Sequence, residues 1–130
     1  KNIERHVEVY DWLDNEKIRE MLKDVMLFVL PSYNEGMPLS ILEAMSYGIP
    51  IISTPVGGIP SLVKDDENGK LVEPGNHNQL KNAIIELYNN KDKRVRISKN
   101  NYHLILNKFS IEKNLKKIHN IYHELLKSDE

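Results

Sequence analysis

Residues 25–54 read VMLFVLPSYNEGMPLSILEAMSYGIPIIST and predict a strand, a helix and a second strand. The first strand is the continuous apolar run 25–30. Pro38 suits the first position of a helix, and Gly48 suits the position just after its end. The next apolar run, residues 49–54, predicts another buried strand. Strands that are apolar on both faces are typical of a parallel sheet covered by helices on both sides.

Further elements are expected on both sides of this stretch. Residues 6–10 predict a strand, and residues 16–23 predict a helix capped by Asp14 or Asn15. After residue 54 the pattern predicts a short helical piece, a strand and three helices, at residues 61–63, 70–73, 76–88, 91–108 and 110–125. This alternation predicts an α/β fold: a partial doubly wound, Rossmann-like parallel sheet flanked by helices, with further helices at the carboxyl end. Because such a sheet usually has five or six strands and about four are visible here, we expect residues 1–130 to be a single domain that lacks its first strands.

Composition narrows the class of protein. The chain has 130 residues, 40% of them hydrophobic and 28% charged, which is typical of a globular domain. It contains no Cys, no apolar run of the roughly 20 residues that span a bilayer, and no signal peptide, so we expect a cytoplasmic protein. The net charge of −1 argues against a nucleic-acid partner. Residues 8–73 hold 12 acidic and 5 basic side chains, whereas residues 91–117 hold 9 basic and 2 acidic ones. This basic part is expected to be a solvated helical surface; the alternative is a patch that faces another domain or anionic lipid, the latter as peripheral contact at the inner face of a membrane.

Two glutamates mark the expected ligand site. In open α/β sheets, ligands bind beyond the carboxyl ends of the strands, and Glu35 and Glu43 follow the strand at 25–30, eight positions apart in a Glu-x7-Glu spacing. A carboxylate can accept hydrogen bonds from the two hydroxyls of a ribose. Gly36 allows the backbone to approach a ligand, and a helix start offers free amides to a phosphate, here those of Met37, Leu39 and Ser40. Taken alone, however, the pair is better explained as a solvated loop residue and a helix-favouring residue.

The surrounding motif changes this interpretation. Residues 31–76 contain the blocks PS-x-x-EG-x-PL-x-x-x-EAM-x-x-G-x-P, GG-x-P and NG-x-LV-x-PG. They resemble the signature of family 4 retaining glycosyltransferases of the GT-B fold, and the resemblance extends over nearly the whole chain. It implies the donor-binding second half of such an enzyme, which transfers a hexose from a nucleotide sugar to a glycan, a lipid-linked sugar or a polysaccharide. It also implies that no metal and no cofactor is bound besides the donor, such as a UDP- or GDP-hexose.

The resemblance assigns a role to individual positions. Glu35 matches the catalytic glutamate near the transferred sugar, and Glu43 matches the glutamate that binds the ribose. The donor's sugar and diphosphate would meet Gly36, Met37, Pro38, Leu39 and Ser40. A second loop at the cleft corresponds to Gly57 and Gly58, and the base pocket begins at Asp11, Trp12 and Leu13. Two residues depart from the pattern, Asp11 where Gly is common and Ser61 where Glu is common, so the identity of the base stays open.

The resemblance also places important parts outside the chain. The family's phosphate-binding Arg and Lys and its N-terminal acceptor domain both precede residue 1, so the chain alone is expected to be inactive. Two alternatives stay open. One is a non-catalytic half-protein that binds a nucleotide sugar and needs a partner chain, and the other is a basic helical adaptor on a degenerate α/β core. His119 and His123 stand one helical turn apart without an evident third ligand, and we expect them to be surface residues.

Overall fold

The computed structural model of the chain describes residues 3–127, and these contain one sheet of three parallel strands. The strands are β1 (Phe28–Leu30), β2 (Ile51–Ser53) and β3 (Gly69–Leu71), in the spatial order β1-β2-β3. Val29 lies opposite Ile52, which in turn lies opposite Lys70. The predicted parallel α/β sheet is confirmed in this part of the chain.

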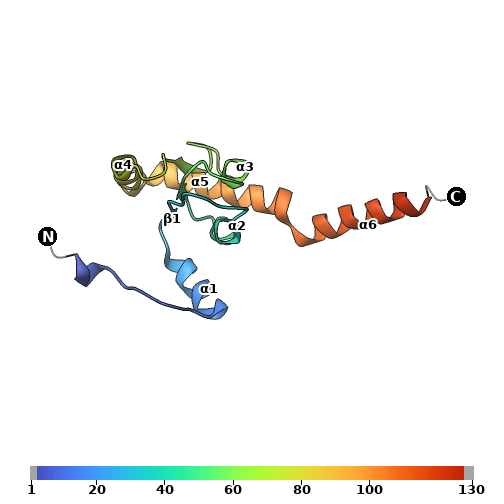
Figure 1. Cartoon of the computed structure of the whole chain (residues 1–130), viewed down its shortest axis with the longest axis horizontal. Helices are drawn as coiled ribbons and strands as arrows, with labels where there is room; N and C mark the ends of the chain where they lie inside the picture. Colours follow the sequence, from blue (N-terminus) through green and yellow to red (C-terminus); the bar gives the residue numbers. More distant parts are fainter. Residues whose placement is uncertain (1–2, 128–130) are drawn as a thin grey trace.

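Helices surround this sheet and extend beyond it (Figure 1). In chain order they are η1 (Glu4–His6), α1 (Asn15–Asp24), α2 (Leu39–Ser46), α3 (Ile59–Leu62), α4 (His77–Asn89), α5 (Lys91–Leu104), η2 (Ile105–Phe109) and α6 (Ile111–Lys127). The first, η1, is a 3-10 turn, and η2 is a π-helical turn that joins α5 to α6. All the predicted helices are present, with ends that differ by a few residues from those expected.

The core lies on both faces of the sheet, and consecutive residues of β2 supply both halves because strand side chains alternate between faces. Ile51 packs with buried residues of α1, α2 and α3, and Ile52 packs with buried residues of α4 and α5. All three residues of β2 are fully buried. The expectation that helices cover the sheet on two sides is therefore confirmed at its central strand.

The helix ends follow the capping residues that the sequence offers. Asp14 accepts a hydrogen bond from the Lys17 amide at 2.7 Å, and Asn76 accepts one from the Gln79 amide at 3.0 Å. Gly48 follows α2 with φ +70°, as expected for a residue that ends a helix. Pro38, in contrast, is the N-cap of α2 and not its first helical residue. The reason is that its ψ of 111° is extended, which puts it outside the helix.

The predicted strand at residues 6–10 is wrong. His6 belongs to η1, and the residues after it are extended and exposed without forming a strand. A strand exists only when a neighbouring strand accepts and donates its backbone hydrogen bonds. Among the described residues no strand lies beside this segment, since β1 pairs with β2 alone.

The first strand is also more exposed than its apolar sequence predicts. Only Phe28–Leu30 of the run 25–30 are paired, and Val25 is the C-cap of α1. The Val29 side chain is 37% exposed. Among residues 3–127, β1 is an edge strand with a neighbour on the β2 side alone, so less of the surrounding structure packs over it than over the central strand.

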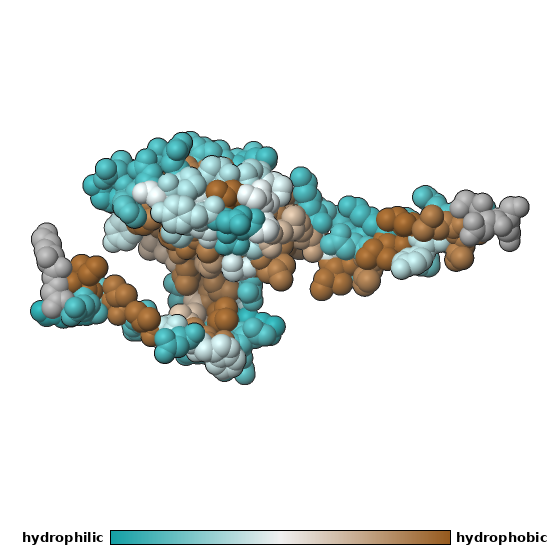
Figure 2. Space-filling model, viewed as in Figure 1, coloured by the Kyte–Doolittle hydropathy of each residue, from teal (hydrophilic) through white to brown (hydrophobic). Residues whose placement is uncertain are grey.

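The last helix leaves the body of the molecule (Figure 1). Its apolar side chains gather on one side, seen in brown in Figure 2. All are at least 50% exposed: Ile111, Leu115, Ile118, Ile121, Tyr122, Leu125 and Leu126. The amphipathic pattern predicted for α6 is present, and yet none of its residues is buried.

A group of charged side chains connects the turn before β3 to α4 and α5. The Lys70 Nζ lies 3.1 Å from Asp66 Oδ1 and 3.7 Å from Glu86 Oε2. Lys93 pairs with the same two carboxylates. The hydrogen bonds from Lys93 and Lys70 hold the pKa of Asp66 below its usual value, because they stabilise the charged form.

We expect Asp66→Asn to lower the melting temperature slightly at pH 7, by about 3 °C, because exposed ion pairs contribute less than about 1 kcal/mol. Asn tolerates the φ of +60° found here, so the turn should persist. A carboxylate with a lowered folded-state pKa stabilises the protein above its unfolded pKa of about 3.9. That stabilisation disappears as the pH falls through the folded-state value. Thermal unfolding should therefore show the two proteins converging in acid, with Glu67→Gln in the same turn as the control. A difference that is unchanged in acid would contradict this account.

Candidate functional site

Two loops meet at the carboxyl end of the sheet, one after β1 and one after β2. The Gly58 amide donates a hydrogen bond to the Gly36 carbonyl oxygen at 2.7 Å. Gly57 has φ +54°, and a Cβ on it would lie 1.7 Å from the Glu35 carbonyl oxygen. No side chain fits at this position, so glycine is required for both the backbone conformation and the close contact. The loops that carry Glu35 and Gly57 are therefore packed directly backbone to backbone.

Hydroxyl side chains reinforce the pairing of β1 and β2 at the last residues of the strands and just beyond them. Ser53 donates from its Oγ to the Leu30 carbonyl oxygen at 2.7 Å, and Thr54 donates from its Oγ1 to the Ser32 carbonyl oxygen at 2.6 Å. Both donors are fully buried. The Ser32 Oγ in turn donates to Glu35 Oε1 at 2.7 Å. These bonds hold the half-buried Glu35 side chain at the edge where ligands of α/β sheets bind.

The second glutamate lies on the helix that follows. Ile41, Ala44 and Met45 turn one side of α2 into the core. Glu43 stays half-buried, one turn after Leu39, whose side chain is 75% exposed. The amides of Leu39 and Ser40 belong to the first turn of α2, where a helix offers donors and a partial positive charge to an anion.

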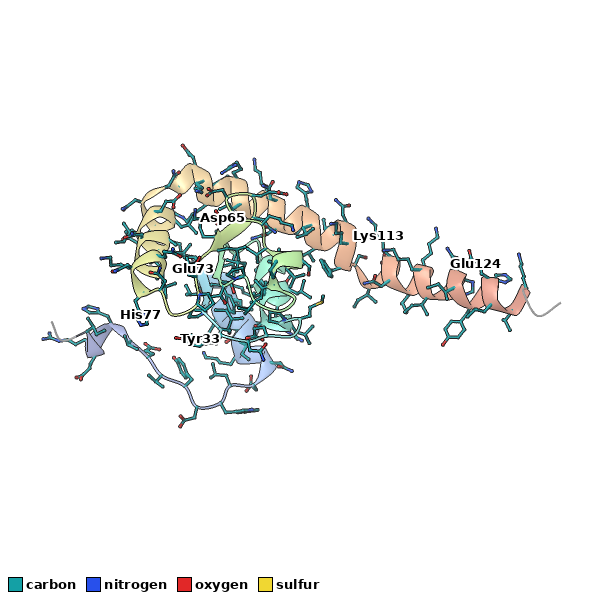
Figure 3. All side chains as sticks on the ribbon, turned by 45° about the horizontal axis from the view of Figure 1, so that its top comes forward. Tyr33, Asp65, Glu73, His77, Lys113 and Glu124 are labelled. Carbon is teal, nitrogen blue, oxygen red and sulfur yellow. The ribbon has the colours of Figure 1, made fainter. Side chains whose placement is uncertain are left out.

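The predicted base-pocket residues are not brought to these loops. Asp11 and Trp12 are exposed, the latter at 79%, and Leu13 is half-buried. They lie on the extended segment that leads from η1 to α1 along the outside of the body (Figures 1 and 3). The structure thus brings together Glu35, Gly36, Gly57 and Gly58 but leaves Asp11 and Trp12 outside this group.

A neighbouring pocket was missed by sequence reasoning. It has a volume of about 230 Å³ and is lined by Pro31, Tyr33, Val72, Glu73, Gly75, Asn76, His77 and Leu80. Figure 3 labels three of these residues on the same side of the body: Tyr33, Glu73 and His77. A Cβ on Gly75, which has φ +75°, would lie 2.9 Å from the Tyr33 hydroxyl oxygen. The sequence Pro74-Gly75 is typical of a turn, but its spacing from Tyr33 does not indicate a pocket.

Residues 3–127 contain no group of three or more His, Asp or Glu side chains that could hold a metal ion. His119 and His123 face each other on α6 with ring centroids 5.9 Å apart, and both are exposed, as expected of surface residues. In the same part of the chain, no helix combines the length and the apolar character that a membrane crossing requires.

The motif residues thus lie in two interlocked loops at the ligand-binding edge of a parallel sheet. The family model described as "Glycosyl transferases group 1" matches residues 1–104. The chain belongs to this family. The match to the group 1 glycosyltransferases covers both the Glu35 loop and the Gly57 loop.

Individual group 1 glycosyltransferases are similar over most of the chain. The UDP-Gal:alpha-D-GlcNAc-diphosphoundecaprenol alpha-1,3-galactosyltransferase of Escherichia coli is 35% identical over 125 residues, which cover 96% of this chain and 32% of that protein. The structure of sucrose-phosphate synthase from Thermosynechococcus elongatus superposes with a TM-score of 0.87 at 28% identity, over 98% of this chain and 32% of the other. A structure of TarM from S. aureus in complex with Fondaparinux, alpha-GlcNAc-glycerol and UDP gives a TM-score of 0.79 at 29% identity, over 93% and 24%.

These comparisons confirm the fold expected for the second half of a GT-B enzyme. The chain spans about a third of the length of the curated relatives that it matches.

Proposed function

We propose that this chain is the donor-binding half of a family 4 retaining glycosyltransferase. The full enzyme would transfer a hexose from a nucleotide sugar, such as a UDP- or GDP-hexose, to a glycan, a lipid-linked sugar or a polysaccharide precursor. The observation that carries this proposal is the backbone contact of Gly57 and Gly58 with Glu35 and Gly36. Backbone that is packed so closely, at the start of a helix and beside a carboxylate, suits a ligand that has both phosphate and hydroxyl groups.

Each group has a distinct part in the proposed reaction. Departure of the leaving group develops negative charge on the diphosphate, and the amides of Met37, Leu39 and Ser40 stabilise it at the start of α2. The backbone of Gly36 and Pro38, in the same loop, lies against the donor. Glu35 lies beside the transferred sugar, and Glu43 accepts hydrogen bonds from the ribose. The base would sit at Asp11, Trp12 and Leu13, and this requires the exposed segment to lie closer to the sheet in the full enzyme. No metal ion is needed in this scheme.

We further propose that the rest of the enzyme consists of the first strands of this domain and an N-terminal acceptor domain. Two exposed apolar surfaces support this: the edge strand β1 at Val29, and the apolar side of α6. Because basic phosphate-binding residues and the acceptor site would both lie in those parts, the chain alone would transfer no sugar. The enzyme would be cytoplasmic, with any membrane contact peripheral and at the inner face.

The test is donor binding measured by calorimetry in the full-length protein, against UDP-, GDP- and ADP-hexoses. At least one donor should bind, and Glu43→Ala should weaken its binding roughly 30-fold, since losing hydrogen bonds to a carboxylate costs about 2 kcal/mol. The isolated chain, assayed in parallel, should bind it weakly at most. Glu67→Ala, which removes an exposed carboxylate from the turn before β3, is the matched control.

Three outcomes would separate the alternatives. Binding that is lost in Glu43→Ala, in a protein that still folds, supports a nucleotide-sugar site. If the protein binds the donor but transfers sugar only after a second chain is added, the half-protein that needs a partner is favoured. If no donor binds the full-length protein, or if Glu43→Ala binds as well as the unchanged protein, the chain is better described as a helical adaptor and the proposal is wrong.

A further inference from the structure

We propose that Ser32 is a positioning residue for Glu35. Its hydroxyl holds one oxygen of the Glu35 carboxylate. The Ser32 Oγ donates a hydrogen bond to Glu35 Oε1 at 2.7 Å, and both side chains are half-buried. The contact occupies one of the two carboxylate oxygens. The inference rests on the proposed function, in which Glu35 is the catalytic residue.

The serine is itself held in place by the core of the sheet. Thr54 Oγ1 donates to the Ser32 carbonyl oxygen at 2.6 Å, and the Thr54 residue is fully buried after β2. The regular pairing of β1 with β2 ends at Leu30 and Ser53. The Thr54 bond therefore extends that pairing to the first polar residue of the Glu35 loop, which ties a loop side chain to a rigid strand.

The backbone on the other side of Glu35 is fixed independently. The Gly58 amide donates to the Gly36 carbonyl oxygen at 2.7 Å, and Gly57 packs against the Glu35 carbonyl oxygen. With the backbone fixed, what remains free is rotation about the bonds of the Glu35 side chain. The Ser32 hydrogen bond removes that freedom before substrate arrives, which is how a catalytic group is preorganised.

A purely structural role for Ser32 makes a different prediction. A hydroxyl that only closes a four-residue turn would affect folding, and its loss would lower activity only as far as it unfolds the protein. A positioning residue affects the chemical step in a protein that remains folded. A separate effect on kcat, at unchanged donor KM, therefore distinguishes the two roles.

The experiment measures sugar transfer and thermal unfolding in the full-length enzyme with its best donor from the calorimetric screen. Ser32→Ala should lower kcat by about tenfold to a hundredfold, since small misplacements of catalytic groups cost up to about 10²-fold, and leave the donor KM within about twofold. Ser32→Thr keeps the hydroxyl and should restore most of kcat. Thr54→Val removes the hydroxyl that holds Ser32 and should lower kcat in the same way. Ser46→Ala removes an exposed hydroxyl on α2 that bonds a backbone carbonyl, and serves as the matched control.

The outcomes separate failure of this inference from failure of the proposed function. If Ser32→Ala keeps kcat within about twofold while Glu35→Gln loses transfer, Ser32 does not position Glu35 and the function stands. If Ser32→Thr fails to rescue, or if the loss follows the fraction of unfolded protein, the role is structural and the inference is overturned. If Glu35→Gln itself keeps full activity, Glu35 is not catalytic, and both assignments are wrong.

Discussion

Glu35→Gln should lower kcat for sugar transfer by about 10²- to 10³-fold in the full-length protein, the usual effect of removing one electrostatic group from a transition state. Glutamine keeps the size of the side chain and an oxygen that can accept the Ser32 hydrogen bond. What it removes is the negative charge beside the transferred sugar. Steady-state kinetics should show the loss in kcat, with donor KM changed by about twofold or less, because binding of the ribose is assigned to Glu43.

The control for this charge removal is Glu67→Gln. Glu67 is exposed in the turn before β3, at the opposite end of that strand from the Glu35 loop. Its activity should match that of the unchanged protein. A Glu35→Gln enzyme with near-normal kcat, or with a raised KM as its sole defect, would show that Glu35 binds the donor or does nothing, and would remove it from the catalytic role.

Gly57→Ala should be the most disruptive single-methyl change in the chain. The added Cβ would lie 1.7 Å from the Glu35 carbonyl oxygen, and φ of +54° is unfavourable for alanine. Strain and overpacking together should cost about 3 kcal/mol, which corresponds to a fall in melting temperature of about 10 °C. Transfer should be lost below the melting temperature too, because the loop can avoid the clash only by moving away from Glu35.

Gly36→Ala is the matched stability control. A Cβ on Gly36 has no atom within 4 Å, and its φ lies outside the left-handed region. Its melting temperature should therefore stay within about 2 °C of the unchanged protein, as for most surface substitutions. Differential scanning calorimetry of the two variants decides the point. Equal melting temperatures for Gly57→Ala and Gly36→Ala would mean that the two loops do not touch as described.

The sheet and its helices could be predicted because their signals are local. The run at 25–30 is apolar throughout and the run at 49–54 is apolar up to Ser53, Asn76 and Asp14 offer capping oxygens, and Gly48 offers a residue for positive φ. Local sequence could not decide whether residues 6–10 form a strand. Its β-prone side chains are a local property, but a strand also needs a neighbour, which depends on the rest of the protein.

The sequence predicted which residues of the two loops come together, but not their contacts, and it placed Asp11 and Trp12 beside them, where the structure does not have them. The motif named Glu35, Gly36, Gly57 and Gly58, and the structure places them together. The requirement for glycine at position 57 comes from a carbonyl group 22 residues earlier in the chain, so no sequence spacing could reveal it. The hydroxyl chain from Thr54 to Ser32 was missed for the same reason, since each bond depends on how β1 and β2 pair.

The exposure of α6 to solvent has a practical consequence for producing this domain. Because no α6 residue is buried, ending a recombinant protein after Ser110 removes none of the core side chains. It also removes the exposed apolar side chains of α6, which would otherwise favour aggregation of the purified domain. A shortened version is thus the better choice for crystallisation and titration, whereas studies of the whole enzyme should keep the helix and whatever covers it.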